Sequence, residues 1–241
     1  MTAKQYKYLA QVYDHLMRKI DYNGWAEYIY DISDYYKLDL HKSLEIAAGN
    51  CKLAKNILRF TDQIIVSDFS KEMLIQNNDR EILKVCCDMK MLPFRSNFNT
   101  VFCTFDSVNY LMSKEELLQF FTAVENILDP GGIFTFDASL ELNSINNVKY
   151  LNRHGKYNGI KYRQVSDFDS NEMIHTNTFF LELPEGNTIS EIHRQKVFEF
   201  ENYFEVIDDT NMYVSNCFDF FTFDNADRKS ERVQFVLRKY D

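Results

Sequence analysis

The stretch SLEIAAGNCKLAKNIL, residues 43–58, constrains the fold of this chain more than any other. A short apolar run ends in a turn of small residues, and a helical pattern of apolar residues begins directly after that turn. A strand, a tight turn and a helix in this order begin a crossover between parallel strands. The stretch therefore predicts an α/β protein.

The same alternation of strands and helices continues to residue 139. Two helices are expected first, at 4–18 and 23–37. The clearest later helix is 113–128, where Ser113 is the expected N-cap and Glu116 stands in the capping-box position. Strands are predicted at 44–47, 64–67, 82–87, 99–105 and 133–139. Parallel sheets bind ligands at the carboxyl ends of their strands, so we expect a site at 47–51, 68–69, 88–89, 105–110 and 137–139.

The pattern changes after residue 140. Strands predicted at 160–168, 173–183 and 188–198 follow one another without helices, and residues 184–187 form the expected hairpin turn. A helix at 199–209 and two final strands come next. We expect lid helices and the cofactor-binding part of the sheet in 1–139, an antiparallel β flap in 140–198, and the elements that complete the sheet in 199–241.

Charge and cysteine content limit the class of partner and the compartment. The formal net charge of −9 disfavours nucleic acid, whose phosphates need a basic face. The N-terminus lacks the apolar core of a signal peptide, and no apolar run reaches the ~20 residues that cross a bilayer. We therefore expect a cytoplasmic protein without a membrane partner. Five cysteines without metal-type spacing predict reduced thiols and no metal site, with Cys86 and Cys87 as buried strand thiols.

Acidic residues at strand ends suggest a nucleoside site. Asp68 lies about 20 residues beyond the turn at Gly49, where a carboxylate can accept hydrogen bonds from ribose hydroxyls. Asp88 can accept from an adenine amino group while Met89 packs on the ring. Each acid taken singly is better explained as a solvated turn residue or a helix cap. Their shared placement at the ends of predicted strands favours the nucleoside site.

The order of these motifs resembles the class I S-adenosylmethionine-dependent methyltransferases, especially the small-molecule type with an inserted flap. LEIAAGN is similar to that family's first cofactor loop, VSDFSKEML to its second motif, and CCDMKMLPF, FNTVFCTFDSVNYL and LDPGGIFTFD to later ones. The resemblance implies a Rossmann-like, mostly parallel seven-stranded sheet whose last strand runs antiparallel. It also implies S-adenosylmethionine as the cofactor.

The resemblance further implies roles for individual residues. The amino-acid part of the cofactor would be lined by Glu45, Ala47, Gly49 and Asn50, and the adenosine by Asp68, Phe69, Met73, Asp88 and Met89. The sulfonium and the acceptor would lie near Phe105, Asp106 and Asn109, with Tyr13 and Trp25 closing from the lid. Cys51 departs from the family's last loop glycine, and Glu45 from its usual aspartate. A cysteine with positive φ would cost about 1–2 kcal/mol, whereas a thiol facing the loop would crowd the cofactor carboxylate.

Methyl transfer needs alignment of the reactants and, for a protonated acceptor, a base. His193 is the first candidate base, because it lies among polar neighbours on a predicted flap strand; its alternative is an exposed strand histidine. Tyr110 and Tyr13 are further candidates, for which core packing is the alternative. The aromatic residues of the flap suggest a partly apolar acceptor: Tyr157, Tyr162, Phe168, Phe179 and Phe180.

These features predict methyl transfer to a nitrogen or oxygen of a small molecule. Two alternatives stay open: a protein that binds S-adenosylmethionine with little or no turnover, motivated by Cys51, and a methyltransferase that acts on protein or RNA. The sequence leaves the oligomeric state open, with a homodimer as one option.

Overall fold

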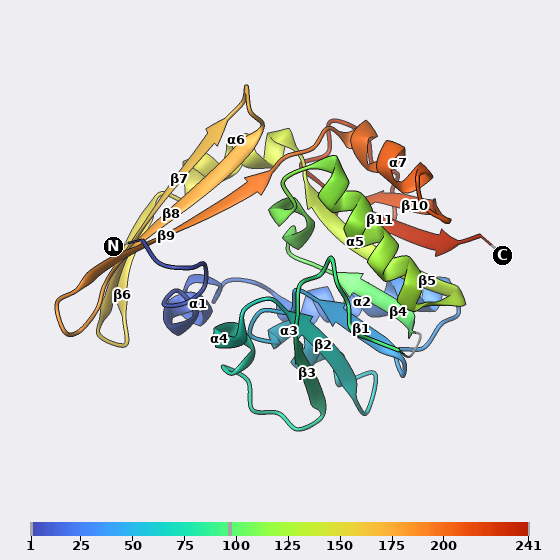
Figure 1. Cartoon of the computed structure of the whole chain (residues 1–241), viewed down its shortest axis with the longest axis horizontal. Helices are drawn as coiled ribbons and strands as arrows, with labels where there is room; N and C mark the ends of the chain where they lie inside the picture. Colours follow the sequence, from blue (N-terminus) through green and yellow to red (C-terminus); the bar gives the residue numbers. More distant parts are fainter. Residues whose placement is uncertain (1, 96–97, 241) are drawn as a thin grey trace.

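A seven-stranded sheet forms the centre of the protein in a computed structural model that describes residues 2–95 and 98–240 (Figure 1). Its strand order is β3-β2-β1-β4-β5-β11-β10. The first five strands in this order are parallel, and β11 runs antiparallel to both neighbours. This confirms the predicted fold. The strands are β1 (Ser43–Ile46), β2 (Ile64–Asp68), β3 (Ile82–Cys86), β4 (Phe98–Cys103), β5 (Leu128–Ser139), β10 (Met212–Asp219) and β11 (Arg232–Lys239).

Helices cover both faces of this sheet. On one face, α5 (Lys114–Ile127) and α7 (Phe200–Asp208) bury aromatic side chains against β4, β5 and β11. On the other, α2 (Tyr22–Tyr35) and α3 (Lys52–Ile57) pack their apolar faces on side chains of β2, β3 and β4. The short helix α4 (Lys71–Leu74) follows Ser70, whose hydroxyl caps it by accepting from the Met73 N–H. The Ser113 hydroxyl likewise caps α5.

A separate four-stranded antiparallel sheet forms the flap, and α6 (Glu141–Tyr150) leads into it. Its strands are β6 (Arg153–Tyr157), β7 (Ile160–Asp169), β8 (Ile174–Glu182) and β9 (Thr188–Lys196). Helix α6 and strand β6 were not predicted. Their sequences, ELNSINNVKY and RHGKY, are mostly polar, and Ser144 is the buried residue of α6, so no apolar period marked them.

The lid packs on the flap rather than standing alone. Helix α1 spans Ala10–Leu16, which is shorter than predicted, because Glu191 on β9 accepts hydrogen bonds from the N–H groups of Tyr8 and Leu9. Apolar side chains of α1 then pack on Tyr162 and Leu181 of the flap. The flap aromatics Tyr162 and Phe179 belong to this core, so the aromatic content does not by itself indicate an apolar acceptor.

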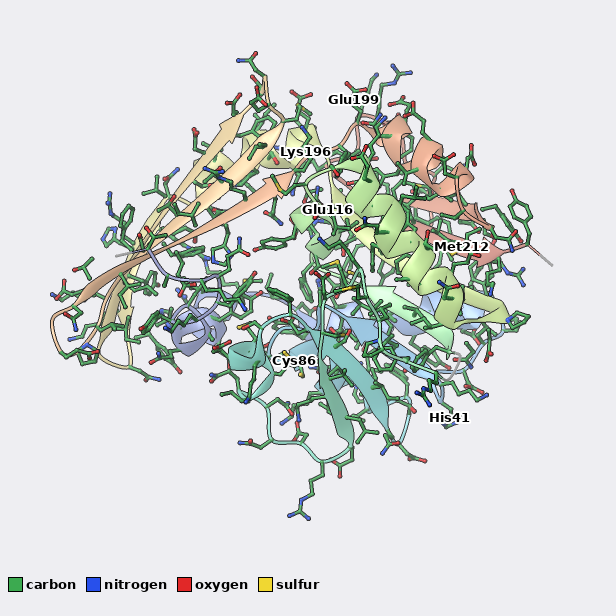
Figure 2. The ribbon with its side chains drawn as sticks, in the orientation of Figure 1. His41, Cys86, Glu116, Lys196, Glu199 and Met212 are labelled. Atoms are coloured by element: carbon green, nitrogen blue, oxygen red, sulfur yellow. The ribbon has the colours of Figure 1, made fainter. Side chains whose placement is uncertain are left out.

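Two further expectations concern surfaces. Cys86, labelled in Figure 2 at the end of β3, is exposed, and Cys87 is half-buried, so the prediction of two buried strand thiols was wrong. The reason is that β3 is the edge strand of the sheet, with β2 as its neighbour in the strand order. Within residues 2–95 and 98–240, no helix has both the length and the apolar character that a bilayer crossing requires.

Candidate active site

A cavity of about 1060 Å³ lies at the carboxyl ends of the parallel strands, beneath the lid and the flap. Every residue predicted to bind the cofactor lines it, with the exception of Asn109. The residues come from four strand ends, from the α2 region and from the lid, so only the fold brings them together. Their placement agrees with the site expected from the strand ends, and their individual roles stay predictions.

The loop after β1 is bent by three left-handed residues, Ala47, Gly49 and Cys51, with φ angles of 56°, 55° and 61°. Asp68 holds this loop from the neighbouring strand. Its Oδ2 accepts from the Gly49 N–H at 2.7 Å, and its Oδ1 accepts from the Ser70 N–H at 2.7 Å. A Cβ at Gly49 would lie 3.2 Å from the Met73 Cε, so the Met73 side chain would have to shift, and the positive φ at this position also favours glycine.

Cys51 adopts the positive φ for which an energetic cost was predicted. Its Sγ lies 3.9 Å from the Gly49 carbonyl oxygen, and Cys51 is not among the residues that line the cavity. The side chain is fully buried in the core beneath α2 and α3, among Trp25, Leu53 and Ala54. Burial raises the pKa of the Cys51 thiol to about 12. The thiol is therefore an apolar packing group, and the loop keeps its shape without the usual last glycine.

The cysteines are expected to differ sharply in reactivity. In the native protein at neutral pH, a thiol-alkylating reagent should modify Cys86 first, because it is exposed. Cys51 and Cys103 should react only after unfolding, since both are buried and burial raises the pKa of each thiol. Mass spectrometry of peptides after timed alkylation measures the order. Modification of native Cys51 as fast as Cys86 would contradict its placement in the core.

Glu45 shows how the cavity fits a cationic ligand. The side chain is 2% exposed, and its Oε2 atom has no hydrogen-bond partner among the described residues. Burial raises the pKa of Glu45 well above its ordinary value, although the backbone N–H of Ala54 opposes the shift. A buried carboxylate that lines a cavity is stabilised by a cation. The α-ammonium of S-adenosylmethionine is such a group, so Glu45 fits the cofactor despite its extra methylene.

The side of the cavity predicted to hold adenosine contains an exposed aromatic ring and a carboxylate that contacts a lysine. Phe69 is exposed at 58%, and the Lys4 ammonium lies 4.5 Å from its ring centroid. The Asp88 Oδ1 accepts from the Lys90 N–H at 2.9 Å, and the Lys90 ammonium lies 3.9 Å from the other oxygen. A stacking ring and a carboxylate beside the strand ends are suited to an adenine.

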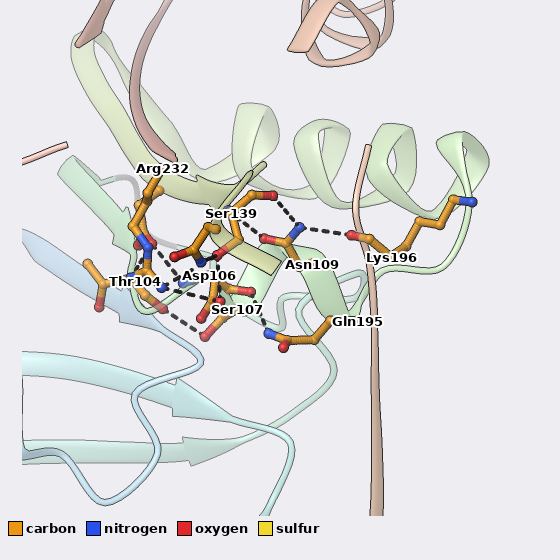
Figure 3. Close-up of polar contacts among 10 residues, drawn as sticks. Thr104, Asp106, Ser107, Asn109, Ser139, Gln195, Lys196 and Arg232 are labelled. Carbon is orange, nitrogen blue, oxygen red and sulfur yellow. Dashed lines mark hydrogen bonds and ion pairs between the residues drawn. The ribbon is translucent and has the colours of Figure 1, made fainter. Parts of the chain in front are cut away.

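A buried charge network joins β4, β5 and β11 at the floor of the cavity (Figure 3). The Arg232 guanidinium lies 3.3 Å from the Asp106 carboxylate and 3.1 Å from that of Asp137. Asp137 Oδ2 also accepts from the Asp106 N–H at 2.8 Å. Phe105 and Asp106 have φ angles of 60° and 48°. Burial raises the pKa of Asp137 to about 7, although Arg232 opposes the shift and Asp106 adds to it. The network fixes a strained turn.

Asn109 is part of this support and is not among the residues that line the cavity, so a role in binding the cofactor stays a prediction. It is fully buried, and its amide donates to the carbonyls of Ser139 at 3.1 Å and Lys196 at 2.8 Å (Figure 3). Its Oδ1 accepts from the Ser139 N–H at 3.0 Å. Asn109 therefore ties the end of β5 to the last residue of flap strand β9.

The predicted catalytic residues occupy two layers. Tyr13, Tyr110 and the unpredicted Tyr6 line the cavity, and the Tyr6 and Tyr110 hydroxyls are 2.7 Å apart. His193 lies behind them, 2% exposed, with its Nδ1 3.1 Å from the Tyr110 hydroxyl and its Nε2 3.6 Å from the Glu191 carboxylate. His193 is not among the residues that line the cavity, and its contact with the Tyr110 hydroxyl links it to the cavity wall.

Sequence reasoning missed the polar residues that the flap turns toward the cavity. Gln164 on β7 and Asn177 on β8 are joined by a hydrogen bond of 2.8 Å. His175 is buried, with its Nε2 2.8 Å from the Ser166 hydroxyl, and burial lowers its pKa. Every second side chain of a strand lies on the same face. If one flap residue had been known to face the cavity, this period would have identified the other residues on that face.

Comparisons with known proteins agree with this geometry. Residues 44–136 match a family model described as a methyltransferase domain. "Putative methyltransferase YqeM" of Bacillus subtilis is 26% identical over 97% of each chain. An S-adenosylmethionine-dependent methyltransferase from Clostridium acetobutylicum superposes with a TM-score of 0.79 at 20% identity, over 98% of this chain and 99% of the other. The sugar N-methyltransferase KedS8 from Streptoalloteichus superposes with a TM-score of 0.76 at 15% identity, over 100% and 98%.

Proposed function

We propose that this chain, which is an S-adenosylmethionine-dependent methyltransferase of the class I fold, methylates a nitrogen or an oxygen of a small molecule. The cavity under the flap carries this proposal. Its volume of about 1060 Å³ slightly exceeds the upper end of the ~300–1,000 Å³ range common for small-molecule sites, which fits a site shared by a cofactor and a small acceptor. The similarity to KedS8, a sugar N-methyltransferase, supports an acceptor of this size.

S-adenosylmethionine supplies an electrophilic methyl group, so the chain has to bind, align and desolvate the reactants. On the sheet side, Glu45, Asp68 and Asp88 would hold the cofactor's ammonium, ribose and adenine. Phe105 and Asp106 present a rigid turn between the two halves of the cavity, since Arg232 and Asp137 hold it. Trp25 packs on Phe105 with ring centroids 4.4 Å apart, which extends this rigid wall to α2.

Tyr110 is the group that we propose orients the acceptor. Burial raises the pKa of Tyr110 and of Tyr6 well above the ordinary value, so both are neutral phenols at physiological pH. A neutral hydroxyl bonded to His193 on one side can accept a hydrogen bond from an acceptor N–H or O–H on the other. His193 and Glu191 are then positioning residues for this hydroxyl.

Replacement of Tyr110 with phenylalanine should lower kcat by about 10- to 100-fold, because an acceptor hydrogen bond is lost without loss of volume. The dissociation constant of S-adenosylhomocysteine should not change. Tyr35→Phe is the control, since Tyr35 is 57% exposed outside the cavity. Methyl-transfer kinetics and calorimetry measure the two quantities. An unchanged kcat in Tyr110→Phe would remove this residue from the mechanism.

Transfer of labelled methyl groups tests the class of acceptor. The protein is incubated with labelled S-adenosylmethionine and a cell extract, and the small-molecule, protein and RNA fractions are separated. Label is expected in the small-molecule fraction, and enrichment in protein or RNA would favour the second alternative. The low-turnover alternative was motivated by Cys51, and the burial of this residue outside the cavity lining weakens that motive. All five cysteines are free thiols, which supports the cytoplasm as the compartment.

A further inference from the structure

We propose that the methyl acceptor carries an anionic group, a carboxylate or a phosphate, which Arg153 and Asn177 bind on the flap side of the cavity. This inference rests on the proposed function and names the acceptor class for the same site. It depends on three observations: the division of charge around the cavity, the contacts of Arg153, and the direction of one chain of hydrogen bonds.

Charges in the cavity wall are divided between its two sides. The carboxylates all come from the main sheet and its helices: Glu45, Asp68, Asp88, Asp106 and Glu116. The cations nearest to them are already paired, as Lys52 is with Asp14, Lys90 with Glu116 and Arg232 with Asp106. The cations of the lid and the flap are Lys4, Arg18, Lys19, Arg153 and Arg194. None of these five has an ion-pair partner in the part of the chain that the structure describes.

Among these five cations, Arg153 is the one whose position is hardest to explain as that of an ordinary solvent-exposed side chain. Its side chain is half-buried at the start of β6, where Nε donates to the Gln164 Oε1 at 2.8 Å and Nη1 donates to the Leu16 carbonyl at 3.1 Å. Both partners are neutral, and burial lowers the pKa of Arg153, with the Arg18 charge adding to the shift. A desolvated guanidinium held by neutral groups is stabilised by an anion. In an otherwise acidic protein, that anion can come from the acceptor.

The hydrogen bonds that continue from Arg153 present donors to the cavity. A guanidinium has only donors, so Gln164 must turn its oxygen toward Arg153 and its NH₂ toward Asn177. Asn177 then accepts through Oδ1 at 2.8 Å, which leaves its NH₂ group as the donor at the cavity wall. This direction does not depend on which amide atom is assigned as nitrogen. Two donor groups, Arg153 and Asn177, therefore face a space that contains no flap carboxylate among its lining residues.

Calorimetric titration with inorganic phosphate and, separately, with acetate tests the inference, each with and without saturating S-adenosylhomocysteine. The native chain is expected to bind one of the two anions. Arg153→Gln should weaken that binding by about tenfold or more, as expected for loss of a charged hydrogen-bonding partner. Asn177→Asp should weaken it by a similar factor, because it keeps the oxygen that accepts from Gln164 and replaces the donor with a charge.

Arg163→Gln is the matched control, since Arg163 is exposed on the outer face of the flap, one residue before Gln164. It should bind the anion as the native chain does. The tighter of the two anions identifies the acceptor's group as phosphate or carboxylate. Binding of neither anion, equal binding in Arg153→Gln, or equal losses in Arg163→Gln would each overturn the inference.

These titrations distinguish a failure of the anion site from a failure of the proposed cofactor site. Failure of all variants and the native chain to bind S-adenosylhomocysteine would count against the cofactor site, whereas anion binding that requires Arg153 would still support the anionic site. Unchanged thermal unfolding midpoints show that the variants are folded. Arg153→Lys provides a second check: it keeps the charge but loses the forked contact to Gln164 and Leu16, so it should restore part of the anion affinity lost in Arg153→Gln.

Discussion

Replacement of Asp68 with alanine is expected to weaken binding of S-adenosylhomocysteine by about two orders of magnitude. The Asp68 carboxylate accepts from the Gly49 and Ser70 N–H groups, both at 2.7 Å. It therefore shapes the loop after β1 and the start of α4 at once. Each hydrogen bond to a charged group contributes about 1.5–3 kcal/mol, and both bonds are lost together with any bond to the ribose. Isothermal calorimetry measures the affinity.

Asp68→Asn separates shape from charge, because an amide oxygen can still accept one of the two N–H bonds. It should bind S-adenosylhomocysteine more weakly than the native chain and more tightly than Asp68→Ala. Asp62→Ala is the control, since Asp62 is an exposed residue before the same strand, and its affinity should equal the native value. An affinity of Asp68→Ala within about threefold of native would contradict the role assigned to this carboxylate, since threefold is under 1 kcal/mol.

Replacement of Arg232 with methionine is expected to lower the free energy of unfolding by about 3–5 kcal/mol. The guanidinium lies within 3.3 Å of Asp106 and 3.1 Å of Asp137, and Asp137 is fully buried. Methionine fills part of the volume but leaves two carboxylates without their cation. Urea denaturation measures the change. Arg228→Met is the control, because Arg228 is 77% exposed in its pair with Glu201 and should change stability by at most about 0.5 kcal/mol.

The stability loss in Arg232→Met should grow with pH. Burial raises the pKa of Asp137 from its ordinary value of 3.8 to about 7. Because the pKa of Asp137 is higher in the folded state than in the unfolded state, the protonated carboxyl favours folding. This contribution to the free energy of unfolding is fully present below about pH 4 and is lost as the pH rises through about 7. Without Arg232, ionised Asp137 has no compensating charge. The deficit relative to the native chain should therefore be smaller near pH 5 than near pH 8, and a deficit that falls over this range would contradict the pairing.

Local patterns were sufficient for the main sheet and for the position of the cofactor site. Strand and helix signals at 43–58 and Ser113 depend on residues a few positions apart, so they can be read directly from the chain. Parallel strands must place their carboxyl ends at one edge, which is why Glu45, Asp68 and Asp106 were expected together before any geometry was known. The structure brings all three to one cavity.

The errors share a physical origin in long-range contacts. His193 was the first candidate base, with an exposed strand histidine as the alternative, and both readings placed it at a surface. It is 2% exposed, because Tyr6 from the N-terminal segment packs on its ring with centroids 4.6 Å apart. Asn109 lies within a recognised motif, but the flap carbonyl of Lys196, 87 residues away, takes its amide. The polar helix α6 and strand β6 were missed, because tertiary contacts rather than apolar periodicity hold them.

The amino-acid sequence alone determined that this chain forms a mostly parallel sheet with a nucleoside-type site at its strand ends, since periodicity and turn chemistry act between near neighbours. Only the tertiary structure decided which side chains face the acceptor. That choice depends on the register of four flap strands and on how α1 packs against them. A shift of one residue in that register would turn Gln164 and Asn177 away from the cavity, and no local pattern specifies it.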